Sequence, residues 1–156
     1  MMKPAGKPAF QQGRQAVVLL VEDNPDHAFL TQEAFEECGQ KINLQHVDNG
    51  EKCLMFLRRQ APFETAPRPD LILLDLHMPR MNGFEVMEAI AGDEALCGIT
   101  VVVLSTSAEG KEVQRMYRLG CRSFMVKPFD FSVFSAAIKQ LTSYWFGLVV
   151  LPDYSN

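Results

Sequence analysis

DLILLDLHMPRMNG, residues 70–83, is the stretch that decides the fold of this chain. Its apolar run, residues 71–74, has no polar alternation, which is typical of a strand buried on both faces of a parallel sheet. The run ends abruptly at Asp75, and the turn residues in MPRMNG predict a loop over 78–83. A helix from about residue 84 to residue 91 follows. The stretch therefore predicts a strand, a loop and a helix, with an acid at the carboxyl end of the strand.

The same unit recurs on both sides of this stretch. AVVLLV, residues 16–21, is a second buried strand, and Asn24 is expected to cap the helix that follows it. A loop over residues 60–70 holds three prolines. We expect strands at residues 16–21, 43–47, 71–74, 101–104 and 123–126, and helices at 25–38, 51–59, 84–91, 111–119 and 131–144.

Five strand and helix units predict an α/β fold, because short apolar strands that alternate with helices form a parallel sheet covered on both faces. At this length the natural choice is the flavodoxin-like (βα)5 doubly wound sheet, with strand order 2-1-3-4-5. We expect a flexible N-terminal tail over residues 1–15, one domain over residues 16–146 and a C-terminal tail over residues 147–156.

Composition excludes several classes of protein. The chain has 156 residues, a net charge of −4 and a pI near 5.4, which disfavours nucleic acid as the main partner. Its four cysteines lack the spacing of a zinc site and suit a reducing cytoplasm. There is no signal peptide and no apolar run long enough to span a membrane. The sequence therefore predicts a cytoplasmic protein that does not bind a membrane.

Polar residues follow four of the predicted strands. Glu22 and Asp23 follow the first, Asp75 the third, Ser105 the fourth and Lys127 the fifth. Since the carboxyl ends of parallel strands meet at one edge, these groups should converge. Clustered carboxylates repel one another unless a cation is bound, and hard oxygen ligands suit Mg²⁺. One carboxylate could then attack phosphorus while an ammonium and a hydroxyl hold the phosphoryl oxygens.

At this point a family resemblance is apparent. VEDNPD (21–26), DLILLDLHMPRMNG (70–83), VVVLSTS (101–107) and SFMVKPF (123–129) together resemble the CheY-like response-regulator receiver domains, over roughly residues 16–145. The resemblance implies roles for individual residues: Asp75 as phosphoacceptor, Glu22, Asp23, Asp75 and the backbone carbonyl of His77 as ligands of Mg²⁺, Ser105 as switch hydroxyl, Phe124 as switch aromatic, Lys127 as phosphate-binding lysine and Pro128 as a cis-proline.

A narrower resemblance concerns the partners. The proline-containing loop at 60–70 and the ending YWFGLVVLP (144–152) look like single-domain regulators paired with cyanobacterial and bacterial phytochromes. This implies a sensor histidine kinase, such as a phytochrome, as phosphoryl donor and a downstream phosphorelay or output protein as receiver of the signal. The chain would be a phosphoacceptor signalling protein rather than an enzyme. It departs from the family at Glu22, where Asp is commoner, at Ser105, where Thr is commoner, and at His77.

Three further hypotheses follow from the residues. A pseudo-receiver that takes no phosphate is disfavoured by the complete acidic, hydroxyl and lysine set. A flavodoxin-like redox protein is disfavoured because the loop after the first strand is acidic and would repel a flavin phosphate. The nearly apolar run 144–151 predicts a homodimer through the last helix and tail, with a tail folded back on its own sheet as the alternative. His27 and His46 are predicted to be surface residues.

Overall fold

Five strands and five helices alternate along residues 14–151, the part of the chain that the computed structural model describes. Most of the predicted N-terminal tail and residues 152–156 of the C-terminal tail lie outside this part. The elements are β1 (Ala16–Val21), α1 (Pro25–Glu36), β2 (Ile42–Val47), α2 (Gly50–Leu57), β3 (Leu71–Asp75), α3 (Gly83–Ala91), β4 (Thr100–Ser105), α4 (Gly110–Leu119), β5 (Ser123–Val126) and α5 (Phe131–Gly147).

The sheet is parallel and its strand order is β2-β1-β3-β4-β5. The predicted fold class and strand order are therefore confirmed. β3 lies at the centre of the sheet, with β1 and β4 as its neighbours, and β5 forms one edge. This order decides the site, because it places the carboxyl ends of β1, β3 and β4 side by side.

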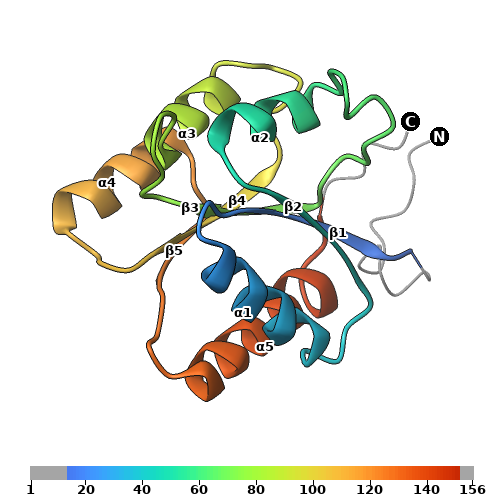
Figure 1. Cartoon of the computed structure of the whole chain (residues 1–156), viewed down its shortest axis with the longest axis vertical. Coiled ribbons are helices and arrows are strands. Elements are labelled where there is room, and N and C mark those ends of the chain that lie inside the picture. The colour runs from blue at the N-terminus through green and yellow to red at the C-terminus, as the bar shows by residue number, and fades with distance from the viewer. Residues whose placement is uncertain (1–13, 152–156) are drawn as a thin grey trace.

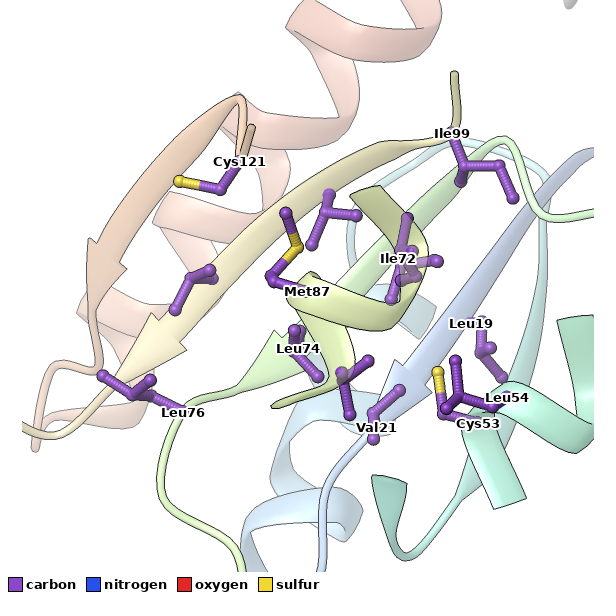
Figure 2. Close-up of a cluster of buried hydrophobic side chains, with 14 of the residues drawn as sticks. Leu19, Val21, Cys53, Leu54, Ile72, Leu74, Leu76, Met87, Ile99 and Cys121 are labelled. Atoms are coloured by element: carbon purple, nitrogen blue, oxygen red, sulfur yellow. The ribbon is translucent and has the colours of Figure 1, made fainter. Parts of the chain in front are cut away.

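Helices cover both faces of the sheet: α1 and α5 lie on one face and α2, α3 and α4 on the other (Figure 1). Alternate strand residues point to opposite faces. In β3, Ile72 and Leu74 pack with α2 and α3 in the cluster drawn in Figure 2, whereas Leu71 and Leu73 pack with α1 and α5. The central strands are buried on both sides, which explains their unbroken apolar sequences.

Local signals fix where the helices begin. The Asn24 side chain accepts hydrogen bonds from the backbone N–H groups of Asp26 and His27, at 2.9 and 3.2 Å, so its predicted capping role is confirmed. Asp130 caps α5 in the same way. Asn82 and Glu85 form a capping box at the start of α3. All three caps follow a segment that carries a residue of the site: Asn24 follows Asp23, Asn82 follows the loop after Asp75, and Asp130 follows the loop after Lys127.

The last helix is longer than predicted. It runs to Gly147, and Phe146 in its last turn is 2% exposed, packed in the core between α1, α5 and the sheet. Leu151 also packs against this core. The apolar residues that remain exposed here are Tyr144, Leu148 and Val150. Among the described residues, no helix combines the length and the apolar character needed to cross a membrane.

Candidate functional site

The polar residues that follow the strands meet at the carboxyl edge of the sheet, as the sequence predicted. Asp75 is the last residue of β3, and Glu22 and Asp23 follow β1 directly. Carboxylate oxygens from these three residues lie within 4.8 Å of one another. Lys127 follows β5, and its Nζ lies 3.6 Å from Asp75 Oδ1. Three acids and one ammonium from three different strand ends therefore form one cluster.

The loop that carries Asp75 is held by a glycine. Gly83 donates its N–H to the Leu76 carbonyl at 2.9 Å. A Cβ at Gly83 would lie 2.9 Å from the Asp75 carbonyl oxygen and 2.9 Å from Leu76 Cα, closer than a side chain tolerates. Arg80 turns the loop with a φ of 67°, in the left-handed region. The backbone of Asp75 is thus fixed by the start of α3.

Glu22 is a buried carboxylate with a defined set of partners. It is 2% exposed, and its Oε1 accepts a hydrogen bond from Lys127 Nζ at 2.5 Å. Its Oε2 accepts the N–H of Asn24 at 3.3 Å. Because a buried charge is costly unless it is paired, Lys127 is what keeps Glu22 ionised. Lys127 lies between Glu22 and Asp75 and neutralises part of the charge of both.

The electrostatics of the two buried acids differ. Burial raises the pKa of Asp75 to about 7, opposed by Lys127 and reinforced by the charges of Glu22 and Asp23. Burial also raises the pKa of Glu22, but the hydrogen bond and charge of Lys127, together with hydrogen bonds from Asp75 and the Asn24 backbone, leave that pKa below its usual value. One lysine is therefore too little positive charge for three acids. A divalent cation fits this oxygen donor set, because it would favour the ionised form of Asp75.

Ser105 and Phe124, the two residues predicted to form a switch, lie at the end of β4 and on β5. Ser105 is fully buried at the end of β4, and its Oγ accepts the N–H of Ser107 at 3.3 Å. Phe124 is half-buried and packs against the core under α3 and α4. Its backbone N–H donates to the hydroxyl of Tyr117 at 3.1 Å. The hydroxyl and the aromatic ring lie on neighbouring strands, as the sequence indicated.

Two histidines that we predicted to be surface residues contact the site, and His46 is exposed as predicted. His27 Nδ1 lies 3.4 Å from Lys127 Nζ and 3.6 Å from Glu22 Oε1. His46 Nε2 lies 2.8 Å from the Glu22 carbonyl oxygen. His27 is exposed at its outer side, so the surface prediction was only partly right. The available signal was the position of His27 in the first turn of α1, four residues after Asp23.

Two other predicted residues need comment. The imidazole of His77 points to α4, where its Nε2 lies 3.6 Å from Glu112 Oε1, so it is not one of the clustered groups. The proposed metal ligand of His77 is its backbone carbonyl, which remains a prediction.

The cis-proline prediction for Pro128 was wrong: among residues 14–151 the cis peptide bond is Ala61–Pro62. An X–Pro bond prefers trans only weakly, so sequence alone does not decide its isomer.

A small cavity of about 150 Å³ adjoins the cluster. Its polar lining includes Lys127 and His27, and Leu30, Phe129 and Phe134 contribute apolar surface. Of these apolar side chains, Leu30 of α1 and Phe129 in the loop before α5 are exposed. An apolar surface thus adjoins the acidic cluster.

Comparison with known proteins gives a consistent result. The sequence profile described as the response regulator receiver domain matches residues 18–139. The probable methanogenesis regulatory protein FilR2 of Methanothrix harundinacea is 35% identical over 132 residues, which cover 84% of each chain. The response regulator Rcp1 of Synechocystis is 34% identical over 136 residues, 87% of this chain and 92% of Rcp1.

Solved structures agree with these sequence relatives. The phosphorylated cyanobacterial phytochrome response regulator RcpA superposes with a TM-score of 0.85 at 33% identity, over 90% of this chain and 100% of that chain. The Mn²⁺-bound form of Rcp1 superposes with a TM-score of 0.82 at 33% identity, over 88% of this chain and 99% of that chain. The acidic cluster described above therefore lies in a fold for which a metal-bound and a phosphorylated structure are known.

Proposed function

The chain belongs to the response regulator receiver domain family, and from this premise we propose that it accepts a phosphoryl group on Asp75 from a histidine kinase. It is a signalling protein of a two-component system. The observation that carries the assignment to Asp75 is the cluster of Glu22, Asp23 and Asp75 with Lys127 at the carboxyl edge of the sheet. Asp75 ends the central strand, and burial raises its pKa to about 7. A bound cation would therefore change the ionisation of Asp75 more than that of the other two acids.

Mg²⁺ is the proposed metal, held by Glu22, Asp23, Asp75 and the backbone carbonyl of His77. When bound, it would neutralise charge on the carboxylates and on the incoming phosphoryl oxygens. The residues of the chain supply the rest. An Asp75 carboxylate oxygen attacks phosphorus, the P–N bond of the phosphohistidine breaks, and the imidazole leaves with the electron pair. Lys127 and Ser105 would hold the phosphoryl oxygens. Hydrolysis of the acyl phosphate returns the resting state, and we propose no other chemistry.

Intact-mass spectrometry tests this proposal directly. Incubation of the chain with acetyl phosphate and Mg²⁺ should add one phosphoryl group, and EDTA should suppress the addition. Acetyl phosphate replaces the kinase, so the result does not depend on the identity of the natural donor. A chain that gains no mass at saturating acetyl phosphate and Mg²⁺ contradicts the proposal.

Ser105 is the proposed switch hydroxyl, acting with Phe124. Ser105→Ala should still gain the phosphoryl group in good yield but lose the conformational response, because no hydroxyl draws β4 toward the phosphate. Amide hydrogen exchange over residues 105–128, with and without phosphorylation, measures that response. Ser107→Ala is the matched control, since it removes an exposed hydroxyl two residues away. A normal response in Ser105→Ala would show that the hydroxyl has no switching role.

The proposed phosphoryl donor is a sensor histidine kinase of the phytochrome type, because the similar protein RcpA is a cyanobacterial phytochrome response regulator. Leu30 and Phe129 are exposed apolar side chains that line the cavity beside Lys127. We propose that the kinase contacts this apolar surface, because it adjoins the acidic cluster that contains Asp75. A downstream phosphorelay or output protein would receive the signal.

The proposed compartment is the cytoplasm. The four cysteines are free thiols, which fits a reducing compartment.

We also propose that the protein forms a homodimer through α5 and the residues after it. Tyr144, Leu148 and Val150 remain 48%, 71% and 61% exposed, even though Phe146 beside them is buried. The double substitution Leu148→Ser and Val150→Ser should shift the protein from dimer to monomer, because it removes apolar surface without changing the core.

Light scattering on the wild type and on the double variant measures this change in mass. Val126→Ser is the matched control, because Val126 is an exposed valine on β5, outside α5, and the change should leave the dimer intact. A wild type that is monomeric with and without phosphorylation would refute the homodimer.

A further inference from the structure

Helix α4 is anchored more weakly than its neighbours. Met116 is its one fully buried side chain, whereas α3 buries five residues and α5 another five. Glu109, at the N-cap of α4, makes no capping hydrogen bond with its side chain. Few buried contacts and an uncapped end make an element easy to displace. The position of α4 therefore depends on a small number of polar contacts.

Three of those contacts come from side chains of α4. Arg115 pairs with Glu88 at 2.9 Å, and Glu112 lies 3.6 Å from the ring of His77. The first contact joins α4 to α3, and the second joins α4 to the loop after β3. The third is different: the hydroxyl of Tyr117 accepts a hydrogen bond from the backbone N–H of Phe124 at 3.1 Å. It joins α4 to the strand that leads to Lys127.

The geometry of β5 explains why Tyr117 fits there. β5 is an edge strand that pairs with β4 alone, and Lys127 donates its N–H to the Ser105 carbonyl at 2.7 Å. Because successive N–H groups of a strand point to opposite sides, the N–H of Phe124, three residues earlier, faces the open edge. An unpaired N–H on an edge strand needs a partner. The hydroxyl of Tyr117 supplies it.

We propose that the hydroxyl of Tyr117 couples α4 to β5, so that a displacement of β5 at the phosphorylated site is passed on to α4. The input of this coupling rests on the proposed function of Asp75. The side chain of Phe124 carries no hydroxyl and makes no hydrogen bond. The polar link between this strand and the helix therefore runs from the backbone N–H of Phe124 to the hydroxyl of Tyr117. Tyr117 touches no reacting group and is a positioning residue that acts through the backbone of Phe124.

Tyr117→Phe keeps the ring and removes the hydrogen bond. In the unphosphorylated protein, amide exchange at Phe124 and over residues 113–119 should rise about fivefold, the change in an opening equilibrium expected from one neutral hydrogen bond. Thr65→Val is the control, because it removes an exposed hydroxyl from the loop between α2 and β3, outside α4, β5 and the proposed dimer interface. Unchanged exchange in Tyr117→Phe, relative to that control, overturns the coupling.

A second arm uses beryllofluoride and Mg²⁺ as the phosphoryl mimic. In the wild type, exchange should change over both 123–127 and 110–119. In Tyr117→Phe the change should remain over 123–127 and be lost over 110–119. A normal response of α4 in the variant overturns the coupling. A wild type that does not respond to beryllofluoride contradicts the function of Asp75 instead, and the measurement without the mimic still decides the coupling.

Discussion

Asp75→Asn is expected to gain no phosphoryl group from acetyl phosphate, at any Mg²⁺ concentration. The substitution keeps the shape of the side chain but replaces the carboxylate by an amide, which is a poor nucleophile and a weaker metal ligand. Asp75 ends the central strand, and the close approach of its carbonyl oxygen to Gly83 fixes its backbone, so the amide of the variant should occupy the same place as the carboxylate. Loss of the adduct to the level of the EDTA sample is the expected effect.

The control for this experiment is Asp26→Asn. Asp26 is an exposed acid in the first turn of α1, close to the site in sequence but outside the cluster of three carboxylates. The Asp26→Asn variant should gain the phosphoryl group as the wild type does. If Asp75→Asn carries the same adduct as the wild type, Asp75 is not the acceptor, and peptide mapping would identify the acid that is.

The cluster itself could be predicted from sequence because it depends on topology alone. Unbroken apolar strands predict a parallel sheet, and the carboxyl ends of its adjacent strands must meet. Glu22, Asp23 and Asp75 therefore came together as expected, and so did Lys127. The boundaries of most elements were also close, since strong caps such as Asn24 and Asp130 mark them in the sequence.

The remaining features depend on side-chain direction, which periodicity does not reveal. His27 was predicted on the surface, but the first turn of α1 brings its ring to Lys127. The bond between Tyr117 and Phe124 joins a helix to an edge strand through a single hydroxyl, and nothing in the sequence pattern marks it. α5 extends to Gly147 because Phe146 finds space in the core, a matter of packing volume rather than helical propensity.

The raised pKa of Asp75 makes the stability of the folded protein depend on pH. The carboxyl has a pKa of 3.8 in the unfolded chain and about 7 in the folded protein. Between these values the unfolded chain releases a proton that the folded protein keeps. Stability from this group is complete below pH 3.8 and is lost as the pH rises to about 7. Glu22, whose pKa is lowered, changes stability only in more acidic solution, so it does not obscure this range.

Without metal, Asp75→Asn should therefore be more stable than the wild type, and increasingly so as the pH rises. From about pH 5 to about pH 8 the advantage should grow by about 2 kcal/mol, or about 5 °C in the melting temperature. Thermal unfolding in EDTA at both pH values, with Asp26→Asn as control, measures it. Mg²⁺ should then raise the melting temperature of the wild type more than that of Asp75→Asn, because it binds the ionised carboxylate of the folded state. A difference between Asp75→Asn and wild type that stays constant with pH would show that Asp75 is ionised throughout, and that Lys127 alone balances the three acids.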